Sequence, residues 1–124
     1  VCIVSTGYMT HTVLRAAEEL KKEKINVGVI DVFILKPLDD KALLEALKKY
    51  RHVITVEEGF IGKGGLDTAV SVILEEGQAQ TRLKRLGFRD EHVYEMGDRA
   101  YLHGINGLDA DGISGVVRKL LKEN

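Results

Sequence analysis

The residues best suited to chemistry lie together, where a short apolar run ends in two carboxylates and a glycine-rich stretch. Glu57 and Glu58 follow the run Val53–Val56, and Gly62, Lys63, Gly64 and Gly65 come shortly after them. Paired carboxylates suit acid/base catalysis. However, adjacent residues of a strand point to opposite faces, so these two cannot share a site. We therefore expect one of them to be buried or at an interface and the other to be solvated.

The glycine-rich stretch is a candidate phosphate cradle, because an apolar helical pattern follows it. Gly62-Lys63-Gly64-Gly65 fits neither G-x-G-x-x-G nor G-x-x-x-x-G-K-[ST], and Gly64 stands where a hydroxyl would meet Mg²⁺. One interpretation is an anion site at a helix N-terminus. The other, which we favour, is a tight strand-to-helix crossing with close packing.

The histidines and the cysteine do not form a metal site by their spacing. Cys2 has no partner for a disulfide, which fits a reducing cytoplasm, and it lies in an apolar run, where we expect a small buried hydrophobe. His103 and Arg99 fall in a long polar segment and are candidates for contacting a substrate or a partner. We assign no catalytic residue and no metal ligand.

Composition excludes several classes of protein. The 124 residues fit one domain spanning 1–124, and 18 basic and 19 acidic residues are interspersed, giving a net charge of -1. No basic block indicates nucleic-acid binding, and no apolar stretch approaches the roughly 20 residues of a membrane span. The chain opens on a strand-like run without an initiator Met, so we expect a fragment or one subunit of a larger enzyme.

The elements that must position these residues alternate between strand and helix. Runs of β-branched and apolar residues predict four strands, and apolar positions at helical spacing predict four helices. The strands are expected at Val1–Val4, Asn26–Val32, His52–Val56 and Leu83–Phe88. The helices are expected from Thr10 or Thr12 to about Lys24, over Asp40–Tyr50, over about Leu66–Glu76, and after Asp109 as N-cap.

The first helix should bury Val13, Leu14, Ala17 and Leu20, and Arg89–Leu108 should be an irregular loop. The order of elements predicts an α/β fold with three layers, α/β/α. Its sheet should have four to five strands and be mostly parallel, with a mixed sheet as the alternative.

Several short motifs together resemble the C-terminal domain of the transketolase family of thiamine-diphosphate enzymes. The family includes deoxyxylulose-phosphate synthase and the β subunits of 2-oxoacid dehydrogenases. Each motif is weak alone, but their order and spacing cover essentially the whole chain. They are Thr6-Gly7, Lys36-Pro37-Leu38-Asp39, Thr55–Gly59, Gly64-Gly65-Leu66 and Gly107–Ile113, in which Asp109 replaces the usual Thr.

The resemblance implies a domain that assists an enzyme without carrying its chemistry. In that family, thiamine diphosphate and Mg²⁺ are bound by other domains, and Gly97-Asp98-Arg99 here differs from the family's Gly-Asp-Gly metal motif. The assembled enzyme would transfer two-carbon ketol units between sugar phosphates. This domain would serve assembly through Glu57–Gly65 and the segment 89–108, which departs from the short helix typical of a transketolase at that place.

The implied partners are the remaining transketolase domains or a second subunit, in a cytoplasmic homo-oligomer that binds neither nucleic acid nor membrane. Three alternatives remain open. The chain could belong to a deoxyxylulose-phosphate synthase, or to a 2-oxoacid dehydrogenase β subunit that docks on an acyltransferase core. It could also be a stand-alone module that binds an anionic metabolite at Gly62–Leu66.

Overall fold

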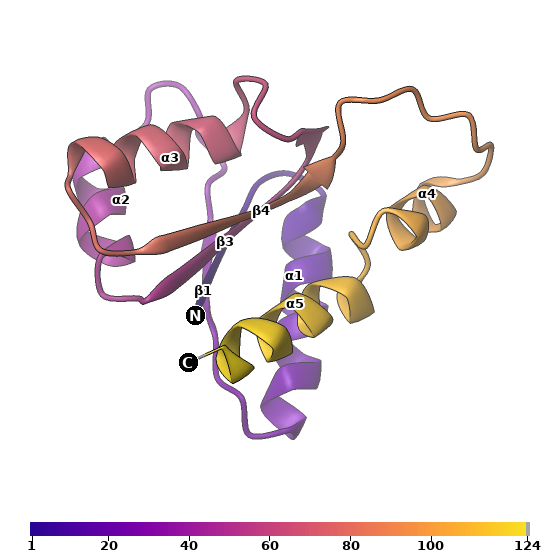
Figure 1. Ribbon diagram of the computed structural model, residues 1–124, viewed down its shortest axis with the longest axis horizontal. Coiled ribbons are helices and arrows are strands. Elements are labelled where there is room, and N and C mark those ends of the chain that lie inside the picture. The colour runs from indigo at the N-terminus through magenta and orange to yellow at the C-terminus, as the bar shows by residue number, and fades with distance from the viewer. Residues whose placement is uncertain (124) are drawn as a thin grey trace.

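The computed structural model describes residues 1–123 and shows a parallel sheet between two layers of helices (Figure 1). The sheet contains β1 (Cys2–Ser5), β2 (Gly28–Asp31), β3 (His52–Phe60) and β4 (Arg82–Phe88), in the spatial order β2-β1-β3-β4. Every strand pair is parallel. The predicted three-layer α/β/α class is confirmed, and the mixed-sheet alternative does not apply to the described strands.

The strand order explains on which face each helix lies. The helices are α1 (Met9–Lys22), α2 (Asp40–Leu47), α3 (Leu66–Glu76), α4 (Arg99–Ile105) and α5 (Ala110–Lys122). Crossovers between parallel strands are right-handed, so the connection from β1 outward to β2 runs on the opposite face from those leading back to β3 and β4. Accordingly, α1 and α5 cover one face, and α2 and α3 cover the other (Figure 1).

Alternate residues of the central strands divide the core into two layers. Ile3 and Ile54 face α1 and α5, whereas Cys2, Val4 and Val53 face α2 and α3. This alternation follows from the period of two in a strand. No helix among the described residues is long and apolar enough to cross a membrane.

The first helix differs from its prediction in both its start and its buried stripe. It begins at Met9, and neither Thr10 nor Thr12 caps it; the Thr10 hydroxyl instead donates to Asp31 Oδ1 at 2.9 Å. Leu14, predicted in the core, is 48% exposed. Both α5 and the sheet pack on α1, so its buried face is rotated about the helix axis relative to the predicted one. The buried residues are Met9, Thr12, Val13, Ala16 and Leu20.

Other boundaries shift in ways that matter for the site. β3 continues past the predicted Val56 to Phe60, so Glu57 and Glu58 belong to the strand itself. β2 is shorter than the predicted Asn26–Val32, and α2 ends at Leu47 instead of Tyr50. The helix α3 occupies the predicted Leu66–Glu76, and Asp39 and Asp109 cap their helices through Ala42 N–H and Gly112 N–H, both at 2.9 Å.

Candidate functional site

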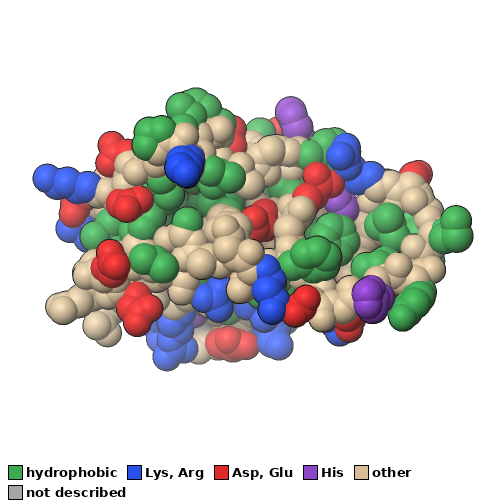
Figure 2. Space-filling view, turned by 90° about the horizontal axis from the view of Figure 1, so that it is seen from above, with side chains coloured by type: hydrophobic (Ala, Val, Ile, Leu, Met, Phe, Trp, Pro, Cys, Tyr) green, Lys and Arg blue, Asp and Glu red, His purple; other side chains and the backbone are tan. Residues whose placement is uncertain are grey.

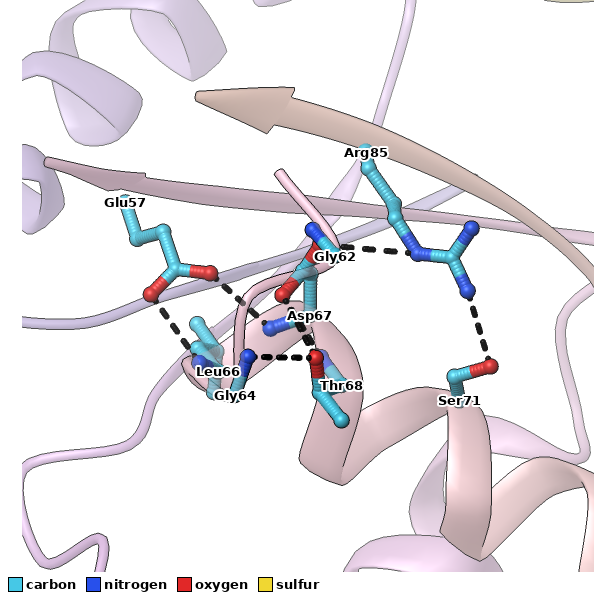
Figure 3. Close-up of polar contacts among 8 residues, drawn as sticks. All are labelled: Glu57, Gly62, Gly64, Leu66, Asp67, Thr68, Ser71 and Arg85. Atoms are coloured by element: carbon cyan, nitrogen blue, oxygen red, sulfur yellow. Dashed lines mark hydrogen bonds and ion pairs between the residues drawn. The ribbon is translucent and has the colours of Figure 1, made fainter. Parts of the chain in front are cut away.

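Glu57 is a buried carboxylate that closes the N-terminus of α3 (Figure 3). Leu66 N–H donates to its Oε2 at 2.9 Å, and Asp67 N–H donates to its Oε1 at 3.0 Å. The first backbone amides of a helix lack partners within the helix, and a negative charge there is stabilised by the helix dipole. Glu57 therefore occupies the position that an external anion would take.

A second carboxylate, that of Asp67, fixes the glycine-rich loop. Gly62 N–H donates to Asp67 Oδ2 at 2.6 Å, and Thr68 N–H donates to Oδ1 at 2.7 Å. On its other side lies Arg85 of β4, whose Nε is 3.5 Å from Asp67 Oδ2 and whose Nη2 donates to Ser71 Oγ at 2.8 Å (Figure 3). The loop, α3 and β4 are thus joined by one network.

The glycines of this loop are required by its shape. Gly62 and Gly64 have φ of +73° and +88°, a region that side chains disfavour. A Cβ on Gly65 would collide with the carboxylate of Glu57. This geometry agrees with the tight crossing, and an anion at Gly62–Leu66 would have to displace Glu57 from the helix N-terminus.

Lys63 points away from this network. Its Nζ lies 2.8 Å from Asp90 Oδ2 in an exposed ion pair, and the hydrogen bond that Lys63 donates to Asp90 raises the pKa of Lys63. Lys63 therefore connects the glycine-rich loop to the segment after β4.

Glu58 points the opposite way from Glu57, as predicted for neighbours on a strand, and contacts α4. Its Oε1 lies 2.9 Å from Arg99 Nε and 2.8 Å from His103 Nε2. The structure thus brings Glu58 together with Arg99 and His103, which were named as candidates in a different part of the sequence. The contact therefore joins α4 to β3.

Two aromatic side chains complete this second cluster, and the sequence analysis missed both. The guanidinium group of Arg99 lies over the ring of Tyr8, with its carbon 4.3 Å from the ring centroid. The His103 ring lies 5.9 Å from Tyr8 and 6.2 Å from Phe88, centroid to centroid. A signal was present, because Tyr8 follows the turn after β1 and Phe88 ends β4, and parallel strands end at one edge.

The prediction of an irregular loop from Arg89 to Leu108 is wrong over its second half. Asp98 Oδ1 accepts from Tyr101 N–H at 2.8 Å and begins α4. Leu108 N–H donates to His103 O and Gly107 N–H to Gly104 O, with Gly107 at φ +68°. This Schellman arrangement ends the helix. A short helix is therefore present at this place, although its residues differ from those expected of a transketolase.

The chemistry of these residues does not fit a diphosphate or its metal. The glycine-rich loop directs its amides to Glu57, Asp67 and Thr68, and Asp98 serves as a helix cap. No group of His, Cys, Asp and Glu within residues 1–123 is arranged to hold a metal ion. Burial raises the pKa of Cys2 to about 11, which agrees with its predicted place as a small buried hydrophobe.

Large hydrophobic side chains are exposed at the carboxyl edge of the sheet, where all the strands end. This edge carries most of the large hydrophobic side chains that are exposed, and three others lie on the outer faces of α1, α3 and α5. Figure 2 shows one group of them at the end that carries the segment after β4. The edge residues are Tyr8, Phe33, Ile34, Leu35, Phe60, Val93, Tyr94, Met96, Tyr101 and Ile105.

A groove of about 450 Å³ lies at the β2 end of this edge. Side chains of the β2–α2 connector and of α2 line it, among them Phe33, Pro37 and Leu43. In Figure 2 hydrophobic side chains also surround a hollow in the half of the molecule that carries α2 and α3 in Figure 1. Apolar surface thus lies at both ends of the carboxyl edge.

Comparison with known proteins gives consistent matches. Residues 1–113 match the family model described as transketolase, C-terminal domain. The chain is 35% identical to a 1-deoxy-D-xylulose-5-phosphate synthase of Parabacteroides distasonis over 124 residues, which cover 100% of this chain and 19% of that protein. It is 38% identical to the transketolase of Homo sapiens over 124 residues, which cover 98% of this chain and 19% of that protein.

A solved structure agrees with these matches. A split gene transketolase, described as an inactive beta4 tetramer, superimposes with a TM-score of 0.84 at 33% identity, covering 98% of this chain and 39% of that one. The chain spans about a fifth of the length of the curated relatives it matches.

Proposed function

Because the chain belongs to the family of transketolase C-terminal domains, we propose that it is the assembly domain of a transketolase-like thiamine-diphosphate enzyme. The assembled enzyme transfers two-carbon ketol units between sugar phosphates. This domain joins the remaining domains or a second subunit, in a cytoplasmic homo-oligomer. Thiamine diphosphate and Mg²⁺ belong to the other domains in this proposal.

The observation that carries the assembly role is the apolar carboxyl edge. Monomeric proteins rarely leave large contiguous apolar patches exposed, and such patches mark interaction sites. A standard interface takes about 800 Å² from each partner, and one fully buried aromatic residue contributes about 150–250 Å². Phe33 and Tyr94, at opposite ends of the edge, are 80% and 85% exposed, and Met96 is 93% exposed. The two aromatic side chains alone therefore expose roughly 250–400 Å², about a third to a half of one partner's share.

The predicted interface residues lie at or beside this edge. Glu58 and Arg99 meet beside Tyr8, and Lys63 reaches the segment after β4 through Asp90. Glu57, Gly62, Gly64 and Gly65 shape the turn that supports it. In this proposal those residues hold the interface in shape, and the exposed apolar side chains make the contacts.

The comparisons also favour a second reading, the C-terminal domain of a deoxyxylulose-phosphate synthase. The synthase of Parabacteroides distasonis and the human transketolase match this chain at 35% and 38% identity. An assay of the assembled enzyme separates the two. A transketolase uses a ketose phosphate donor, whereas the synthase condenses pyruvate with an aldehyde.

The assembly role is tested by substitutions on the edge. In the full assembly, Phe33→Ser and Tyr94→Ser should weaken the association of this domain at least 10-fold, because each removes a large apolar contact (a 10-fold change is about 1.4 kcal/mol). Sedimentation velocity across a concentration series measures this change. Val72→Ser is the matched control, because Val72 is an exposed hydrophobe on α3 away from the edge.

Association that is equally strong in the edge variants and the Val72→Ser control would contradict the assembly role. Circular dichroism of each variant checks that its fold is kept.

A further inference from the structure

The helix α4 is attached to the domain mainly by polar contacts to one carboxylate. Arg99 and His103 both reach Oε1 of Glu58, at 2.9 and 2.8 Å. Of the residues in α4, only His103 is buried, at 4% exposed, while Tyr101 and Ile105 face solvent. The apolar stripe that holds α1, α3 and α5 on the sheet has no counterpart in α4.

The length of α4 gives it little stability of its own. It has 7 residues, and isolated helices shorter than about 12–15 residues are marginal in water. The segment that leads into it, residues 89–98, has no regular structure and exposes Val93, Tyr94 and Met96. Besides His103, α4 is joined to the core through the buried Leu108, which follows its C-terminal end and whose N–H donates to His103 O.

His103 of α4 reaches the place where an open α/β sheet most often binds ligands. The connections from β1 and β3 leave toward opposite edges of the sheet, so the gap between their carboxyl ends is the topological switch point. Tyr8 follows β1, Glu58 lies in β3, and His103 sits between the rings of Tyr8 and Phe88. In this structure one side chain of α4, that of His103, occupies this place.

We propose that α4 is a latch, held closed by Glu58, whose release uncovers the switch-point crevice between Tyr8 and Phe88. Release also frees residues 89–106, with their exposed apolar side chains, to rearrange against a partner. Local opening of this kind occurs in segments with few buried apolar contacts. The latch is a property of the chain itself and goes beyond its proposed role in assembly.

Native-state hydrogen exchange on the full chain tests the latch. In Glu58→Ala the amides of α4 should exchange at least 10-fold faster than in the unaltered chain, while the exchange of β1 and β3 stays the same. Glu58→Gln should give a smaller increase, because its amide oxygen can still accept one hydrogen bond. Glu23→Gln is the matched control, since it breaks another Glu–Arg pair between elements, with Arg118, and should leave α4 unchanged.

Two results would overturn the proposal. One is an unchanged exchange rate in α4 of Glu58→Ala, which would show that the carboxylate does not hold the helix. The other is an equal increase in α4 and β3, which would show that α4 opens only when the whole domain unfolds. If Glu58→Ala does not fold, the same comparison is made with Arg99→Met, which keeps the aliphatic stem of the side chain. The amide exchange rate of Arg99→Met should then increase several-fold in α4 alone.

Discussion

At the scale of single residues, Glu57 and Glu58 are neighbours on one strand but have different roles. Glu57 points into the fold and binds amides 9 and 10 residues further on, whereas Glu58 points to the other face and meets His103, 45 residues away. The divergence of the two side chains could be predicted from the period of a strand. Their partners could not, because the sequence does not show which distant segments share a face.

Replacing Glu57 by Gln should destabilise the domain. The carboxamide offers one acceptor oxygen and turns its NH₂ group toward an amide that Glu57 now satisfies, so a buried donor loses its partner. Such a loss costs about 1–3 kcal/mol in the free energy of unfolding. Urea unfolding followed by circular dichroism measures it.

The control is Glu45→Gln, which removes an exposed i,i+3 ion pair with Lys48 and should change the free energy of unfolding by less than about 0.5 kcal/mol. Equal stability of Glu57→Gln and Glu45→Gln would show that the carboxylate does not support α3.

At the scale of elements, a helix could be predicted from the sequence where it carries an apolar stripe. The bounds of α3 agree with the prediction, because Leu66, Val70, Ile73 and Leu74 are buried at helical spacing. No such stripe exists in α4, and only its caps, Asp98 and Gly107, could have indicated it. The buried face of α1 could not be predicted, because α5, which packs on it, lies almost a hundred residues further along the chain.

The turn from β3 into α3 should not accept even one methyl group. In Gly65→Ala the new Cβ collides with the carboxylate of Glu57, and we expect a loss of about 1–3 kcal/mol in the free energy of unfolding. The same change at Gly115, exposed within α5 and with open space around it, should instead stabilise the domain by about 0.5–1 kcal/mol. Thermal unfolding of both variants compares one substitution in two settings.

Destabilisation of both variants by the same amount would show that the alanine itself, and not the contact with Glu57, sets the cost. A stabilised Gly65→Ala would contradict the tight crossing.

At the scale of the whole molecule, the alternation of strands and helices was enough to predict three layers, because right-handed crossovers leave few alternatives. What the sequence could not show is how the exposed apolar residues gather. Phe33, Phe60 and Tyr94 are far apart in the chain, and each lies at or after the end of a different strand. Only the parallel sheet places them at one edge.

Association through this edge should depend little on salt. The chain has a net charge of -1 with both signs interspersed, and the edge is apolar. Exposed ion pairs are screened at high ionic strength, whereas burial of apolar surface is not. Raising NaCl from about 0.05 to about 0.5 M should therefore change the dissociation constant of the assembly by less than about 3-fold, as measured by sedimentation velocity. A much steeper weakening would assign the interface to charged residues instead.

The carboxylate of Glu57 at the start of α3 has one further consequence. Many helix N-termini of this kind receive their negative charge from a bound phosphate, and their loops then respond to the supply of that ligand. Here the charge is covalently part of the chain and is present as soon as β3 and α3 meet. The negative charge at this turn is therefore supplied by the chain itself, without a bound ligand.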